Sequence, residues 1–158
     1  MDNQIMLAQY HLVLDSRNVL IEYCNTISSA DLLFENHSFG RGGSIRNLFV
    51  HIANTYEFWI INKILNKNIA YTLYHSINTM EEIKLLFDRV NSYIFEFLEQ
   101  YQESLFQKIA IEINGLEEPI EPFKLFTHVI THEFHHKGQI LPMSRHLGYI
   151  PIDTDIIR

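Results

Sequence analysis

Cysteine is almost absent from this sequence, in which Cys24 is the single example. One thiol cannot close a disulfide within the chain, and it cannot build the multi-thiolate sites that hold structural zinc. A disulfide-stapled scaffold and a cysteine-rich metal module are therefore both excluded. Any metal site in this chain has to use other ligands.

Long apolar runs and concentrated positive charge are also missing. No stretch approaches the roughly 20 continuous apolar residues that a membrane span needs. Asp15 and Arg17 interrupt the apolar pattern of the first 20 residues, which argues against a signal peptide. The formal net charge is −7, and Lys and Arg form no long run. Because phosphate binding needs a basic surface, we expect no nucleic-acid partner, no membrane partner and, by default, a cytoplasmic location.

The sequence does contain ordinary globular material. Hydrophobic residues make up 47% of the 158 positions, and charged residues make up 20%. A chain of this length suits one domain with a real core, and we assign residues 1–158 to it. Four segments carry apolar residues at helical spacing, namely 5–27, 45–65, 79–101 and 122–147. The fold class they predict is all-α, a four-helix bundle.

Local signals mark the ends of these segments. Ser44 is suited to cap the second helix, and Thr79 with Glu82 forms a capping box at the third. Pro122 suits the first turn of the fourth helix, which ends at Gly148. The dipeptide 114–115, Asn-Gly, lies inside an alternating apolar stretch and favours a tight turn. We therefore expect a small β-hairpin between helices three and four.

Two histidines of the fourth helix stand four residues apart. At about 100° per residue, His132 and His136 share a side of the helix with Leu125, Val129 and Ile140. We therefore expect both near the centre of the buried face. A buried imidazole needs a hydrogen bond or a metal, and an i, i+4 histidine pair matches the bite of one metal ion. The plainer alternative is that each is a core histidine satisfied by a hydrogen bond.

A third ligand has to come from another helix. His51 is the only histidine of the second helix, and it flanks an apolar stripe that includes Leu48 and Ile52. Three neutral imidazoles with an open fourth position are typical of catalytic zinc. Zinc or nickel is favoured as the one divalent ion, and iron or manganese would also fit nitrogen ligands.

Other polar residues near this face have weaker claims. His128 lies one turn before His132, so it could be a ligand or a partner of one, and Gln139 could orient a ligand or the substrate. His135 points away from the pair. Glu133 and Glu57 also face elsewhere, so neither is a natural general base. Tyr56 and Trp59 could line a pocket, although core packing is the simpler interpretation.

The segment His132-Glu133-Phe134-His135-His136-Lys137-Gly138-Gln139 resembles the H-x-x-x-H-R-G-Q signature of the DinB/YfiT-like family. The likeness extends to the segment 44–53 around His51, to Trp59, and to the tail segments 147–151 and 153–155. Carried over residue by residue, the family's three metal ligands fall on His51, His132 and His136. One departure is Lys137, where the family usually has Arg, and Lys cannot reproduce a bidentate fork.

The resemblance implies a four-helix bundle with a metal near one end, often as a homodimer. It also implies one of two chemistries, because family relatives include metal-dependent thiol transferases, thiol-dependent isomerases and hydrolases. A metal can deprotonate a coordinated small thiol, which then attacks an electrophilic substrate. It can also lower the pKa of a bound water for hydrolysis. We favour thiol transfer, because no obvious catalytic carboxylate accompanies the histidines.

A third hypothesis is not enzymatic. The protein could be a metal-binding stress-response or interaction module that uses the ion structurally. The opposite face of the fourth helix carries Ile130, Phe134 and Leu141, which would be exposed in a simple bundle. Because a large apolar patch usually marks an interface, we expect this face to meet the hairpin or the partner of a homodimer.

Overall fold

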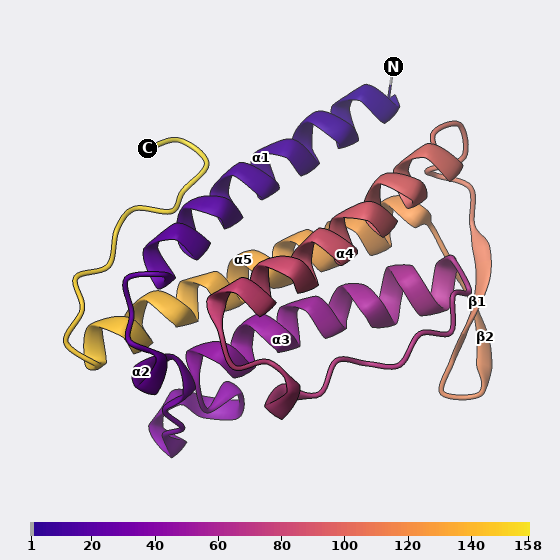
Figure 1. The fold of residues 1–158 in the computed structure, drawn as a ribbon. Helices are drawn as coiled ribbons and strands as arrows, with labels where there is room; N and C mark the ends of the chain where they lie inside the picture. Colours follow the sequence, from indigo (N-terminus) through magenta and orange to yellow (C-terminus); the bar gives the residue numbers. More distant parts are fainter. Residues whose placement is uncertain (1) are drawn as a thin grey trace.

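Four long helices lie side by side in this chain (Figure 1). The structure, a computed structural model, describes residues 2–158, and it describes their side chains except those of residues 2, 3 and 41. The long helices are α1 (Asp2–Cys24), α3 (Ile45–Tyr56) with its continuation η2 (Glu57–Ile64), α4 (Met80–Gln100) and α5 (Pro122–His146). The predicted four-helix bundle with a hairpin before its last helix is confirmed.

Short elements precede α3 and pack against it. The helix α2 (Ser29–Leu33) follows α1, and the 3-10 segment η1 (His37–Gly42) leads into α3. As predicted, the Ser44 hydroxyl caps α3 by accepting from the amide of Asn47 at 3.1 Å. Gly42 lets η1 pack against α3, because a Cβ there would come within 2.5 Å of the Leu48 side chain.

The second long helix changes its winding halfway. Its last eight residues, η2, form a π-helix rather than the continuous α-helix expected for 45–65. A long connection, residues 65–79, then returns along α3 so that α3 and α4 run in the same direction (Figure 1). The Asn62 side chain holds this connection by bonding both the amide and the carbonyl of Ile69. A short 3-10 turn, η3 (Tyr74–Ser76), lies in it.

The predicted capping box and the predicted hairpin turn are both present. The Thr79–Glu82 capping box begins α4. Asn114 and Gly115 adopt φ angles of 54° and 80°, which give the tight turn between β1 (Ile109–Ile113) and β2 (Leu116–Ile120). The two strands pair antiparallel, and β1 contacts η2 at the end of the bundle far from α2.

The fourth long helix is rotated relative to the sequence prediction. Its buried face is centred on Glu133 and Lys137, which are 0% and 3% exposed, while His132 and His136 lie half-buried at its edge. The prediction that the two histidines lie near the centre of the buried face is therefore wrong. The periodicity misplaced them because charged residues count as solvent-facing, and here two charged side chains are buried with partners.

Arg17 is the partner of Glu133, and the pair lies where all four long helices meet. Two guanidinium nitrogens of Arg17 donate to the two Glu133 oxygens, each at 2.7 Å. Tyr56 of α3 donates to the same carboxylate at 2.6 Å, and Arg17 donates to Asn91 of α4 at 2.7 Å. The charge of Glu133 keeps the pKa of Arg17 above its ordinary value, although burial opposes it. Tyr56 is thus a fully buried core residue, as the simpler interpretation held.

Lys137 ties the C-terminal segment to the bundle. Its ammonium donates to the Ser16 hydroxyl of α1 and to the carbonyl of Thr154 at 3.1 Å. Burial lowers the pKa of Lys137 to about 8, so the group remains mostly protonated at neutral pH. A compact ammonium suits this pocket of a hydroxyl and a carbonyl, where no planar fork is needed.

The face bearing Ile130, Phe134 and Leu141 is not exposed in the single chain. Ile130 is buried, and the other two side chains are partly buried and pack against the core. The prediction that this face is exposed in the isolated bundle is therefore wrong, because the rotation of α5 brings it toward the interior. The homodimer stays a prediction.

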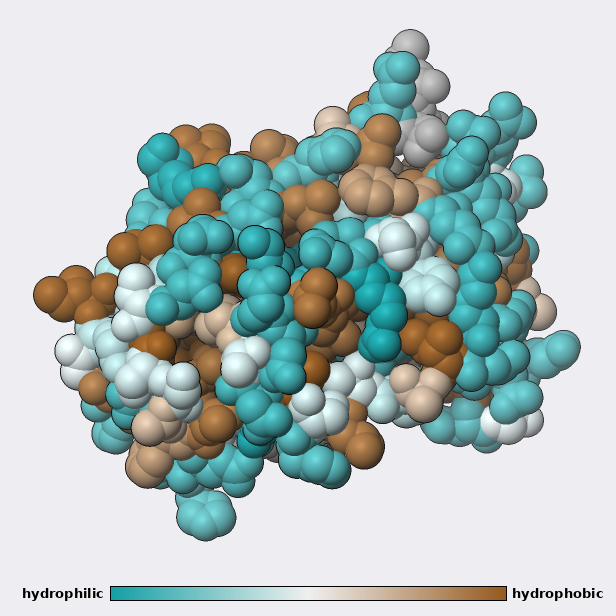
Figure 2. Space-filling model, viewed as in Figure 1, coloured by the Kyte–Doolittle hydropathy of each residue, from teal (hydrophilic) through white to brown (hydrophobic). Residues whose placement is uncertain are grey.

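The outer surface mixes both kinds of side chain. On the face drawn in Figure 2, hydrophobic side chains are scattered among hydrophilic ones. No helix in the described part of the chain is long and apolar enough to cross a membrane. The cytoplasmic location stays a prediction.

We expect the Arg17→Met variant to lose about 3–5 kcal/mol of unfolding free energy, because it leaves the Glu133 carboxylate buried and unpaired. The double variant Arg17→Met/Glu133→Leu should lose less, since neither charge remains. Urea unfolding followed by circular dichroism at pH 7 measures both. Lys67→Met is the matched control: it breaks the half-exposed Lys67–Glu96 pair and should cost at most about 1 kcal/mol. A double variant as unstable as Arg17→Met would contradict this account.

Candidate metal centre

Three histidines from two helices converge beside η1 and η3. His51 lies on α3, and His132 and His136 lie one turn apart on α5. Each offers one nitrogen, and these three nitrogens all lie within 4.8 Å of one another. Their ring centroids are 4.4 to 5.0 Å apart. Residues at this spacing could hold a metal ion.

The spacing of two of the nitrogens fits one ion well. Nε2 of His132 lies 3.1 Å from Nε2 of His136. Two nitrogens that each bind one ion at about 2.0–2.1 Å, with bond angles near 90–110°, would lie about 2.8–3.4 Å apart. The observed separation falls in that range. The donor set therefore fits a divalent metal, although the assignment of all three as ligands stays a prediction.

Gln139 determines which nitrogen of His136 carries the proton. Its Oε1 lies 2.7 Å from Nδ1 of His136, and an amide oxygen can only accept. Nδ1 is therefore protonated, and Nε2 presents its lone pair toward His132. The amide nitrogen of Gln139 lies 3.2 Å from Nε2 of His135 and donates to it. Orientation of a ligand histidine through its other nitrogen is the usual arrangement in metal sites.

The local environment keeps two of the imidazoles neutral. Burial, helped by the neighbouring histidines, lowers the pKa of His132 to about 4. Within the described structure, Nδ1 of His132 is buried with no hydrogen-bond partner, so no acceptor stabilises its charged form. Burial also lowers the pKa of His136, although the Gln139 bond opposes this. Because metals bind the unprotonated nitrogen, both residues are in the binding form at neutral pH.

The histidines open into a hollow of about 660 Å³, which we call the histidine pocket. This volume is typical of small-molecule sites. Besides the three histidines, its walls include Phe39 and Gly40 of η1, Leu48 of α3, Tyr74 of η3, and His135 and Gln139 of α5. None of the described side chains that line it is a carboxylate.

The other polar candidates have different roles. His128 is exposed, and its ring lies 6.0 Å from that of His132 and 5.6 Å from that of Trp59, outside the converging set. Gln139 contacts His136, one of the three predicted ligands. His135 lines the pocket, although its direction on the helix predicted that it would point away from the pair. The direction of His135 on the helix could not predict this position, because it depends on the Gln139 side chain, which contacts both His135 and His136.

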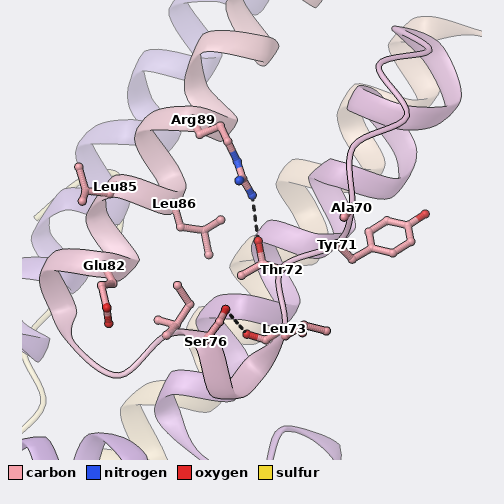
Figure 3. A pocket seen from close by; sticks show the side chains of 10 residues that line it. Ala70, Tyr71, Thr72, Leu73, Ser76, Glu82, Leu85, Leu86 and Arg89 are labelled. Atoms are coloured by element: carbon pink, nitrogen blue, oxygen red, sulfur yellow. Dashed lines mark hydrogen bonds between the residues drawn. The ribbon is translucent and has the colours of Figure 1, made fainter.

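A separate hollow of about 450 Å³ lies between α4 and the connection 65–79 (Figure 3). Its polar groups already bond to one another. Arg89 donates to the Thr72 hydroxyl at 2.9 Å and to the buried Glu57 carboxylate. Glu57 also accepts from the amide and the hydroxyl of Thr72, each at 3.1 Å. This network fixes the connection against the bundle, and it engages Glu57 away from the histidines.

We expect His132 of the metal-free protein to titrate near pH 4, well below the ordinary value of 6.5. Since the unfolded chain takes up this proton at higher pH than the folded one, this residue should make the folded state less stable as pH falls from about 6.5 toward 4. Imidazole NMR titration measures the midpoint. His136→Ala should raise it, because that change admits water beside His132 and removes an imidazole whose charge, when protonated, lowers the pKa of His132. A midpoint near 6.5 in the unmodified protein would contradict the burial argument.

Comparison with known proteins gives the family. A search of curated proteins finds no match. A family model described as the DinB family matches residues 1–158, which is the whole chain. The likeness of the histidine-containing segments to that family is thereby confirmed. This helical bundle with its cluster of three histidines belongs to the DinB family.

Proposed function

We propose that the chain binds one divalent metal ion through His51, His132 and His136 and uses it to activate a small thiol for attack on an electrophilic substrate. One observation carries the proposal: imidazoles held neutral converge on a pocket large enough for a small molecule. A bound divalent ion supplies Lewis acidity and stabilises a thiolate at neutral pH. Three protein ligands leave a position for an exogenous one.

The groups around the pocket support thiol transfer over hydrolysis. A hydrolase of this type needs a group to move the protons of water, and carboxylates serve this purpose often. The two buried carboxylates near the site are committed elsewhere, Glu133 to Arg17 and Tyr56, and Glu57 to Thr72 and Arg89. In thiol transfer the S–H proton leaves to solvent, a carbon–sulfur bond forms, and the leaving group departs with its electron pair.

The residues of the chain have two tasks in this proposal. His51, His132 and His136 bind the ion, and Gln139 keeps Nε2 of His136 unprotonated and oriented. Phe39, Leu48 and Tyr74 supply walls that keep part of the pocket apolar. An apolar wall limits water around a thiolate, and a less hydrated thiolate attacks more readily.

The metal content of the purified protein tests the ligand set. We expect about one equivalent by mass spectrometry after reconstitution, and loss of binding in the His51→Ala, His132→Ala and His136→Ala variants, because each removes one of three ligands. Gln139→Ala should weaken binding by about 10–100-fold, as expected for a group that orients a ligand. His75→Ala, an exposed histidine of η3, is the control and should bind normally. Full affinity in His51→Ala would refute the assignment.

Cobalt substitution separates thiol transfer from hydrolysis. We expect mercaptoacetamide to change the visible spectrum of the cobalt-loaded protein and to add a sulfur-to-cobalt band, because a thiolate joins the coordination sphere. The same thiol should leave cobalt-treated His132→Ala unchanged. An unaltered spectrum at saturating thiol, together with metal-dependent ester turnover in thiol-free buffer, would instead favour a hydrolase. If neither result is obtained, the remaining hypothesis is a protein that uses the metal structurally.

A further inference from the structure

The histidine pocket adjoins a second hollow along α5. This hollow has a volume of about 480 Å³, and we call it the Gly138 hollow after the residue in its floor. Phe39, Gly40 and Gln139 line both hollows, so the two share a boundary. The Gly138 hollow continues from that boundary toward Pro142, Met143 and His146, nearer the C-terminal end of α5.

Within the described part of the chain, no packing contact explains the glycine at position 138. It lies in the interior of α5, where glycine costs about 1 kcal/mol of helix stability relative to alanine. A Cβ built at Gly138 would meet nothing within 4 Å, so no close packing demands the missing side chain. Gly40, across the hollow, also has open space around it, but its φ of 68° by itself favours glycine. Because Gly138 has no side chain, the floor of the Gly138 hollow is open to a ligand.

The walls of the Gly138 hollow suit an uncharged molecular body. Phe39, Pro142 and Met143 offer apolar surface, while Ser38 and His146 offer hydrogen-bonding groups. The His146 ring packs edge-on against Phe39, with the centroids 5.3 Å apart, which positions both at the wall. Among the side chains that the structure describes, no aspartate, glutamate, lysine or arginine lines this hollow. Recognition there would depend on apolar contact and neutral hydrogen bonds.

We infer that the two hollows form one groove for an extended thiol, whose sulfur reaches the three histidines and whose amide-type body lies over Gly138. The inference rests on the proposed function, because it assumes that the thiol binds at the histidines. It adds that the protein selects its thiol by length: a short thiol fills only the histidine pocket, whereas a longer one also contacts Pro142 and Met143.

Two uncharged thiols with the same head test the groove. Mercaptoacetamide is short, and mercaptoacetyl-glycyl-leucinamide carries the same thiol on a longer body. We expect the longer thiol to bind the cobalt-loaded protein about tenfold or more tightly, the scale of added contacts in an apolar pocket. Gly138→Leu should abolish this advantage by filling the floor, while the short thiol binds as before. Gly138→Ala should reduce the advantage in part.

Lys124→Leu is the matched control, because it places leucine at an exposed position of α5 that lines neither hollow. It should retain the full advantage of the longer thiol. Thermal unfolding verifies that the Gly138 variants remain folded, as the gain in helix propensity predicts. If the longer thiol has no advantage, or keeps it in Gly138→Leu, the groove is refuted while thiol binding stands. If neither thiol binds the unmodified protein, the proposed function fails and this inference fails with it.

Discussion

The buried ion pair between Arg17 and Glu133 is the interaction on which the arrangement of this bundle depends. Two charges in a helical core are costly unless every hydrogen-bonding group is matched. Here the Glu133 carboxylate accepts two hydrogen bonds from Arg17 and one from Tyr56. The Asn91 side chain accepts another hydrogen bond from the Arg17 guanidinium. These four residues come from the four long helices. The pair therefore specifies how the helices meet, because any other rotation would leave a charge unpaired.

The position of Glu133 between the two histidines links this pair to the metal centre. With Glu133 directed into the core, His132 and His136 lie at the edge of the buried face of α5, where they meet His51 and the pocket. Lys137, one turn after Glu133, reinforces the same rotation through Ser16 and Thr154. Half-burial is what a reactive site needs: enough desolvation to keep the imidazoles neutral, and enough access for a small molecule.

The surroundings of the histidines divide the polar groups between stability and chemistry. Both nearby buried carboxylates complete structural networks, one in the core and one that anchors the connection 65–79. The described side chains at the pocket are mainly imidazoles, an amide and aromatic rings. In the proposed function the thiol brings its own nucleophile to this site, and the inferred groove over Gly138 gives it room to extend.

Local signals in the sequence were sufficient to predict the helices and the hairpin. Helical spacing, the Ser44 cap, the Thr79–Glu82 box and the Asn-Gly turn act within a few residues, so each predicts its element without knowledge of the rest. The same is true of His132 and His136, since one turn of helix places them together. The pairing with His51 depended on the family resemblance and on its being the single histidine of its helix.

Only the tertiary structure decided what each helix face contacts. Glu133 and Lys137 have the pattern of surface residues, and their burial requires Arg17 and Ser16, more than 100 positions earlier. Partners that distant leave no periodic signal, so the predicted rotation of α5 was wrong. The link from His135 through Gln139 to His136, and the hollow beyond it, likewise arise from side-chain contacts across η1 and α5. The sequence by itself determined the helices and the histidine pair, whereas cross-helix pairing of buried charge determined where that pair faces.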